Sequence, residues 1–442
     1  MNIQLSDHFN YRRLLRFTLP SMIMMIFTSI YSMVDGLFIS NFAGITQFAA
    51  VNLIFPFIQL VSCFGFMFGT GGSALVSATL GAKDPVRANR IFSLVTYTAM
   101  VAGVVIAAVG ITFLRPIAIF MGADSAMLPH CVTYGRIILL ALPAFMLQNL
   151  FQSFLVTAER PALGLCITVA AGITNIVLDA LFVAVLKWNI VGAAAATAIS
   201  QCLGGVVPLI WFCSKNKSPL HLGKTHFDGR ALVSTCTNGL SELVTNISMS
   251  VVSILYNFQL MRFAGENGVA AYGAVMYISF VFVAVFLGYS IGAGPVVGYH
   301  YGAQNHSELK GLFIRSNVIV TAASLLLATI AFTLAAPLAR LFVGDTPVLL
   351  DMTVSAFRFY AVSVLFSGFS IFGSAFFTAL NNGLISAAIS FLRTLVFQVA
   401  AVLILPVFFD LTGVWCSLFV AEILATLVTF LFYHTNRQKY HY

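Results

Sequence analysis

Long apolar runs alternate with short polar segments along the whole chain. About twelve such runs can be drawn, near 14–40, 48–80, 91–114, 131–156, 162–186, 191–213, 232–261, 269–301, 313–336, 354–380, 384–409 and 412–433. A helix needs roughly 20 apolar residues to cross the hydrocarbon layer. Lipid cannot satisfy exposed backbone amides, and the runs are longer than barrel strands. The pattern therefore predicts an all-α integral membrane protein with about twelve transmembrane helices.

The chain also matches itself at an offset of 221 residues, half its length. From Phe42-Ala43-Gly44 onward the match needs no gap, and it pairs Gly71 with Gly292 and Gly81 with Gly302. Shared glycines mark positions where the backbone is constrained, which chance similarity between apolar helices does not require. Duplicated halves of membrane proteins commonly enclose a path between them. We expect two pseudo-symmetric six-helix lobes.

Composition agrees with this class of protein. The 442 residues are 60% hydrophobic and only 8% charged, with a mean hydropathy of +0.97. Soluble domains carry about 25% charged residues. The first run is too long for a signal-peptide core and lacks a small-residue cleavage site, so we expect it to be the first span. The seven cysteines are scattered and form no CxxC pair, so they are expected to be packing residues.

The basic residues sort by connection, which explains the formal charge of +8 without nucleic acid. Alternate connections are rich in Lys and Arg, and the positive-inside rule places both termini in the cytoplasm. The longest basic connection, 214–230, lies at the midpoint of the chain. We expect an N-lobe at 1–213, a cytoplasmic linker at 214–230 and a C-lobe at 231–442, with both lobes in the same orientation.

Four acidic residues fall within apolar spans: Asp35, Asp179, Glu242 and Glu422. An ionised side chain at mid-membrane costs at least about 2.5–3.5 kcal/mol, so such residues face a cavity, find a partner or become protonated. Asn175 and Asp179 are four apart and share a helix face. Burial and a second carboxylate both favour a protonated form that yields its proton to a cation. We expect Asp35 and Asp179 to couple ions, the alternative being neutralisation by hydrogen bonds within the bundle.

Other polar residues in the spans are weaker candidates. Glu242 opens the seventh predicted span, where it either serves the site or is solvated near the cytoplasmic surface. Pro20 permits a bend in the first span and is either a hinge that responds to Asp35 or a residue of the helix start. Two arginines, Arg136 and Arg358, are near-equivalent and suggest a shared anchor, whereas Arg393 has no basic counterpart and would neutralise a carboxylate or exclude cations. Three residues of the fourth span are candidates for lining a pocket: Gln148, Asn149 and Gln152.

Motifs of enzymes are not apparent. The segment that begins at Gly69 lacks the Walker lysine and lies inside an apolar span, and His300 has no ligand partner in view. We find no nucleophile, zinc or nucleotide motif in the sequence. We therefore expect a non-enzyme without cofactor or metal centre, apart from a coupling ion.

These residues together resemble a known family. The repeated Gly-x9-Gly-Ala segment, Val34-Asp35 in the first span and Asn175-x3-Asp179 in the fifth are similar to the multidrug and toxic compound extrusion (MATE) family, in particular its MepA-like bacterial branch. The resemblance implies a cation-coupled antiporter of the bacterial inner membrane with a V-shaped cavity between its lobes. It implies that Asp35 and Asp179 bind the coupling ion, H⁺ or Na⁺, and that Glu159 is a further acidic position. Some members have a second-lobe cation site, but the tenth span here offers no acid, which favours coupling in the first lobe.

The expected function is secondary active multidrug export by alternating access. Its partners would be amphipathic or cationic small molecules and the lipid bilayer, with no nucleic acid, and the protein would be a monomer. Further candidate contacts are Tyr31, one turn before Asp35, together with Glu242 and the three polar residues of the fourth span. The alternative is a flippase for a lipid-linked sugar or other lipid. A membrane enzyme or channel is a competing class, which the missing catalytic cluster and the duplication both disfavour.

Overall fold

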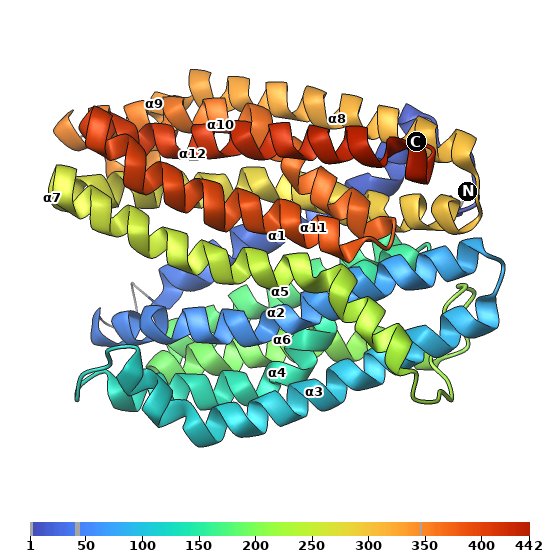
Figure 1. The fold of residues 1–442 in the computed structure, drawn as a ribbon. Coiled ribbons are helices and arrows are strands. Elements are labelled where there is room, and N and C mark those ends of the chain that lie inside the picture. The colour runs from blue at the N-terminus through green and yellow to red at the C-terminus, as the bar shows by residue number, and fades with distance from the viewer. Residues whose placement is uncertain (1–2, 40–44, 345–346) are drawn as a thin grey trace.

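The computed structural model describes residues 3–39, 45–344 and 347–442, and these form a helical bundle (Figure 1). The first triplet of the repeat, Phe42-Ala43-Gly44, lies outside the described residues. The helices of the first half of the chain are α1 (Tyr11–Phe38), α2 (Ile45–Gly81), α3 (Pro85–Phe120), α4 (Leu128–Thr157), α5 (Pro161–Asp179), the π-helix η2 (Ala180–Val185) and α6 (Asn189–Cys213). The remaining helices are α7 (Gly229–Gly302), α8 (His306–Thr333), α9 (Ala335–Val343), α10 (Pro347–Ala379), α11 (Gly383–Phe391), the π-helix η3 (Leu392–Phe397) and α12 (Gln398–Tyr440).

Ten helical runs of the described residues are long and apolar enough to cross a membrane. Two of them are far too long for one crossing: α7 has 74 residues and the run Gly383–Tyr440 has 58. Each contains one residue with non-helical backbone, Gly265 (φ 60°, ψ −150°) and Asp410 (φ 47°, ψ −133°). Figure 1 shows α7 running to one end of the bundle and returning. The chain is thus an all-α membrane protein, and the predicted number of about twelve spans is confirmed.

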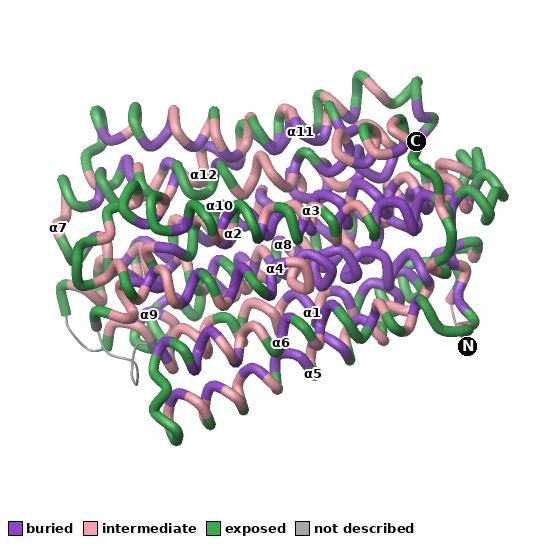
Figure 2. Tube along the Cα trace, turned by 90° about the horizontal axis from the view of Figure 1, so that it is seen from below, coloured by how far each residue is buried: buried purple, intermediate pink, exposed green. Residues whose placement is uncertain are grey.

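One helix in each half of the chain is surrounded by the others. In their most apolar stretches, 78% of the residues of α4 and 72% of those of α10 are buried, whereas the other runs reach 22–50%. These two helices occupy equivalent positions in the repeat. Figure 2 shows the buried trace in the middle of the bundle and exposed residues along its outer faces. The exposed faces carry many large apolar side chains, as a surface in contact with lipid requires.

Buried apolar residues form two large clusters, one from residues 39–231 and one mainly from residues 275–442. The second cluster also contains Leu5, Phe9, Leu14 and Phe17 from the start of the chain. The N-terminal residues therefore pack on helices of the second half, although they belong to the first half of the sequence. The lobe boundaries 1–213, 214–230 and 231–442 stay a prediction.

The repeated glycines lie at close contacts between helices of the two halves. A Cβ on Gly292 of α7 would lie 2.9 Å from Thr18 Cα of α1, and its counterpart Gly71 of α2 lies against Thr235 and Gly239 of α7. Gly81 of α2 likewise lies against Tyr299 of α7, and Gly302 of α7 lies against Ala78 of α2. Small residues let membrane helices approach closely. The Gly-x9-Gly-Ala repeat therefore reflects a symmetric interface between the halves.

Both termini lie at the same end of the bundle, which we call the terminal end (Figure 1). The connection between α6 and α7 also lies there and packs on the start of α3. Asn89 Nδ2 donates to Pro219 O (3.1 Å), and the Gly223 amide donates to Ser93 Oγ (3.0 Å). The connection is therefore held against the first half by specific hydrogen bonds.

The seven cysteines are single thiols, and their positions correct one expectation. Cys63 and Cys131 are buried, as packing residues should be, but Cys166, Cys202 and Cys213 are exposed. A thiol is apolar enough to face lipid, so the outer surface accepts it without a packing role.

Candidate ion-coupling site

Two helices bring the predicted carboxylates together. Asp35 lies near the end of α1, Asp179 is the last residue of α5, and these helices pack against each other. Their contact is close because Gly172 of α5 leaves room for Phe27 and Tyr31 of α1. The two carboxyl groups lie within reach of a side-chain hydrogen bond, although they are 144 residues apart in sequence. The structure thus places the two carboxyl groups side by side.

Three of the four carboxyl oxygens lack donors. Asp35 Oδ1 and both carboxyl oxygens of Asp179 are buried without a hydrogen-bond partner among the described residues. In the described part of the chain no Lys or Arg charge acts on either group, and the charge that Asp179 experiences comes from Asp35. Two such anions side by side in a medium of low dielectric constant repel each other strongly. One proton shared between them, or a bound cation, would remove that repulsion.

Asn175 lies one helical turn before Asp179 and is equally buried. Its Nδ2 lies 3.5 Å from Thr197 Oγ1 of α6, and its Oδ1 has no partner among the described residues. Directly after Asp179 the backbone changes to the π-helix η2. Such π segments are uncommon and occur frequently at functional sites. Asn175 therefore adds a third unpartnered acceptor next to the carboxyl pair.

Polar residues of α4 extend this region. The Tyr31 hydroxyl of α1 lies near the Gln148 side chain, and Tyr134 lies within electrostatic range of both aspartates. Gln148 fits against α6 because a Cβ at Gly204 would lie 2.6 Å from its Cδ. Its Oε1 has no partner in the described structure. The aspartates, Tyr31 and Gln148 form a connected polar group inside the bundle.

The other polar residues of this region divide into two kinds. Gln152, one turn beyond Gln148, and Gln201 of α6 are buried with unpartnered Oε1 atoms among the described residues. Asn149 instead donates to Ser62 O of α2 at 3.3 Å, which is a helix-packing contact. The unpartnered atoms named in this region are all acceptors, which suits a cation or a hydrogen-bond donor.

Two weaker candidates lie elsewhere. Glu242 does not open its helix, because α7 starts at Gly229 and Glu242 lies about 20 Å further along it. It is half-buried beside Cys63 of α2, between the halves, and no hydrogen bond or ion pair of the described residues joins it to the aspartates. Pro20 lies inside α1, which continues through it as one helix.

Glu159 lies outside the spans, in the connection between α4 and α5. Its Oε1 accepts a hydrogen bond from the Leu5 amide at 2.8 Å. Burial raises the pKa of Glu159, and the nearby Asp7 adds to this, while the Leu5 amide and Arg160 act in the opposite direction. Glu159 therefore holds the N-terminal segment and is not part of the carboxyl pair.

The second half contains a neutralised carboxylate instead of a free pair. Arg393 of η3 binds Glu422 of α12 through Nε at 3.0 Å to both carboxylate oxygens and through Nη2 at 2.8 Å to Oε1. The side chains are only 14% and 3% exposed. This confirms the alternative in which Arg393 neutralises a carboxylate. Sequence reasoning had not singled out Tyr134, Thr197 or Gln201, since single polar residues in apolar helices carry no distinguishing pattern.

Comparisons with known proteins agree with this architecture. The MepA multidrug export protein of Staphylococcus haemolyticus is 25% identical over 96% of this chain and 93% of its own length, and that of Staphylococcus saprophyticus is 24% identical over 97% and 94%. Among solved structures, a multidrug resistance MATE family transporter in an outward-facing conformation shares the fold, with a TM-score of 0.93, 24% identity and coverage of 99% of this chain and 98% of that chain.

The family comparison covers both halves of the chain. The sequence profile of the MatE family matches twice, to residues 20–181 and to residues 243–404. The double match agrees with the internal repeat at an offset of 221 residues. Most of the chain is covered, and the order of helices is that of the solved relatives. The chain therefore belongs to the MatE family of membrane transporters.

Proposed function

We propose that this protein is a secondary active exporter that exchanges amphipathic or cationic compounds for H⁺ or Na⁺. The observation that carries the proposal is the adjacent pair Asp35 and Asp179. Three of its four carboxyl oxygens are buried without donors, and it has no basic partner among the described residues. A site of this kind is stable only with a proton or a cation bound. The names of the MepA relatives, which are multidrug export proteins, support the substrate class.

Coupling follows from competition at the carboxyl pair. A proton or Na⁺ that enters from outside neutralises the pair, and a cationic compound binds best when the pair is charged. Asn175 would supply a carbonyl oxygen to the ion, while Tyr31, Gln148 and Gln152 would contact the ion or the transported compound. Exchange of one proton for one monovalent cation moves no net charge, so it would draw on the pH gradient rather than on the roughly 2.3 kcal/mol per charge that 100 mV supplies.

Alternating access would use the interface between the halves. The glycine contacts Gly71, Gly81, Gly292 and Gly302 hold the halves together toward the terminal end. The basic connections lie on that side, so we assign it to the cytoplasm of a bacterial inner membrane. The described state is then closed toward the cytoplasm, as in the outward-facing solved relative. Lobes at 1–213 and 231–442 would rock about this contact in a monomer, with Pro20 of α1 as a hinge.

A flippase for a lipid-linked sugar receives less support. The phosphate groups of such a substrate would require cationic side chains in the path between the halves. The buried polar group of the first half is acidic, and the buried Arg393 of the second half is occupied by Glu422. The charge of the site therefore favours cationic substrates.

The test uses proteoliposomes that contain the full chain, with pH and Na⁺ gradients imposed separately. An interior pH dye reports proton movement, and a fluorescent cationic dye reports export. Asp35→Asn and Asp179→Asn should each abolish dye-stimulated proton movement, because a neutral amide cannot exchange a proton. Export driven by a Na⁺ gradient alone would identify Na⁺ as the coupling ion.

The matched control is Asp351→Asn, which changes an exposed acid at the start of α10. It should leave coupling unchanged. If both substitutions at the carboxyl pair keep the coupling of the unmodified protein, the assignment of the ion site is wrong.

A further inference from the structure

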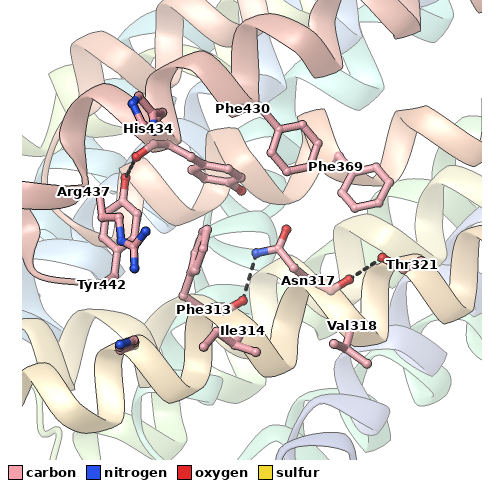
Figure 3. Close-up of a pocket in the computed structure, with 12 residues that line it drawn as sticks. Phe313, Ile314, Asn317, Val318, Thr321, Phe369, Phe430, His434, Arg437 and Tyr442 are labelled. Atoms are coloured by element: carbon pink, nitrogen blue, oxygen red, sulfur yellow. Dashed lines mark hydrogen bonds between the residues drawn. The ribbon is translucent and has the colours of Figure 1, made fainter.

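A groove runs along the outer face of the second half, between α8, α10 and α12 (Figure 3). Its volume is about 720 Å³, within the range of roughly 300–1,000 Å³ usual for ligand pockets. The proposed transport path does not include it, because the carboxyl pair lies between α1 and α5. The groove therefore needs an explanation of its own.

The walls of the groove are apolar and aromatic. The Phe369 and Phe430 rings lie 5.6 Å apart between α10 and α12, and Phe313 of α8 lies 4.8 Å from Tyr433 of α12. Ile314 and Val318 are exposed along the α8 side. Such a lining fits hydrocarbon and gives little reason for water to fill the groove.

One end of the groove is basic. Lys310 at the start of α8 and His434 and Arg437 near the end of α12 line it, and all three side chains are exposed. Within the described residues neither Lys310 nor Arg437 forms an ion pair. Because α8 starts and α12 ends at the terminal end, the free cations gather where a membrane surface would lie (Figure 1).

The length of the groove matches one lipid leaflet. From Lys310 to Thr321 it follows α8 for about three turns, roughly 16 Å at 1.5 Å per residue. This is about half of a hydrocarbon layer of roughly 30 Å. The groove thus begins at the expected headgroup level and ends near the middle of the bilayer.

Two polar atoms along the groove have no partner among the described residues. They are Tyr433 Oη, on a side chain that is 4% exposed, and Asn317 Oδ1. Asn317 Nδ2 donates within its own helix, to Phe313 O at 2.8 Å. Figure 3 shows Asn317 between the aromatic side chains and Val318. Both atoms are buried beneath the surface of the groove, so the exposed basic side chains are the donors available to a phosphate.

We propose that this groove binds an anionic phospholipid, with the phosphate group at Lys310 and Arg437 and an acyl chain along Phe313, Val318 and Phe430. Basic pockets between transmembrane helices bind anionic headgroups in this way. The positive end repels the cationic compounds assigned to the transport path, so the groove is not a second drug site. The inference does not rest on the proposed transport function.

The test measures lipid retention by the purified full chain in detergent, using native mass spectrometry. The probes are phosphatidylglycerol and phosphatidylcholine with identical acyl chains. The unmodified protein should retain phosphatidylglycerol selectively. Lys310→Gln combined with Arg437→Gln should weaken this binding about 25-fold, because each basic residue contributes roughly a factor of five.

Two further variants isolate the groove. Lys83→Gln with Arg87→Gln removes an exposed Lys between α2 and α3 and an exposed Arg in the first turn of α3, and it should leave retention unchanged. Val318→Trp fills the apolar part and should weaken retention with both basic residues in place. Elution as a single peak in size-exclusion chromatography establishes that each variant is folded.

Several outcomes would overturn the proposal. Equal retention of the two lipids would show ordinary solvation by lipid, and equal loss in both double variants would show a general effect of surface charge. Displacement of the lipid by inorganic phosphate alone would assign the basic end to a free anion. A dimer mass that dissociates in the Val318→Trp variant would show that a second copy covers the groove.

Discussion

The carboxylates within the spans of the two halves differ in whether they have a basic partner. Asp35 and Asp179 have each other but no basic partner among the described residues, whereas Glu422 is held by Arg393 at 2.8–3.0 Å. At the offset of the repeat, Tyr256 stands opposite Asp35. The duplication therefore preserves the helices and changes the charges. A free acid can exchange ions, and a paired acid can only hold two helices together.

The ion pair in the second half gives a prediction about stability. Removal of one partner from a buried pair leaves an uncompensated charge and typically costs about 3–5 kcal/mol. Arg393→Met should therefore lower the thermal unfolding midpoint strongly, and Glu422→Gln should also lower it. Arg393→Met combined with Glu422→Leu should recover most of the loss, because no buried charge remains.

The matched control for this series is Arg230→Met, an exposed arginine at the start of α7. Thermal unfolding in detergent, followed by tryptophan fluorescence, is measured for the four variants and the unmodified protein. Single substitutions as mild as the control would show that the pair does not hold η3 to α12.

Whether a site residue can be predicted from the sequence depends on the type of residue. Acids in apolar spans are rare enough to be recognised, so Asp35, Asp179 and their neighbour Asn175 were predicted. Their mutual contact follows from the packing of α1 on α5, which a sequence does not show. The pairing of Arg393 with Glu422, 29 residues apart, likewise needed the structure, since either residue alone fits several roles.

At the scale of helices, the repeated glycines control how closely the halves approach. Gly292 and Gly273 both lie on α7 but have different surroundings. A Cβ at Gly292 would meet Thr18 Cα at 2.9 Å, whereas a Cβ at Gly273 would have no atom within 4 Å. Helix packing, rather than backbone conformation, therefore explains the glycine at position 292.

This contrast predicts different outcomes for one substitution at two positions. Gly292→Val should push α1 away from α7 and cost about 1–3 kcal/mol, as overpacking does. It should also reduce the population closed at the terminal end. Gly273→Val should stay within about 0.5 kcal/mol of the unmodified protein. Distances between spin labels on α1 and α7, together with thermal unfolding, measure both effects, and equal behaviour of the two variants would contradict the argument.

Helix positions were predicted well because apolar runs and polar breaks are strong signals. The breaks expected after residues 261 and 409 correspond to Gly265 and Asp410, where the backbone turns. The π segments η2 and η3 were not predicted. They depend on a local change from i→i−4 to i→i−5 hydrogen bonding, which leaves no compositional mark.

For the whole molecule, the N-terminal segment links the two halves at the terminal end. The Leu5 amide donates to Glu159 of the first half, and the Phe9 amide donates to Glu308 of α8 at 2.9 Å. Arg315 of α8 completes the attachment through Nη1 to Phe9 O at 2.6 Å. This segment of residues 3–10 must release at least one half before the halves separate there. This segment is short and partly polar, so its role cannot be recognised from the sequence.

The attachment at Glu159 should depend on pH. Burial raises the pKa of Glu159 in the docked segment, whereas the released carboxyl is solvated and has its ordinary pKa. Protonation therefore favours docking. This contribution is fully present below the ordinary pKa and is lost as the pH rises through the raised value. Asp7 strengthens the effect, while Arg160 and the Leu5 amide weaken it.

Glu159→Gln separates the charge from the hydrogen bond. The amide oxygen can still accept from the Leu5 amide, but there is no buried charge, so docking should stay firm as the pH rises. Hydrogen exchange at the Leu5 and Phe9 amides, corrected for intrinsic rates, measures this: protection should fall with pH in the unmodified protein and stay level in the variant. Glu266→Gln, an exposed acid of α7, should behave as the unmodified protein. If the Glu159→Gln variant loses protection over the same pH range, the pH dependence arises from another group, and the segment does not sense pH through this carboxyl.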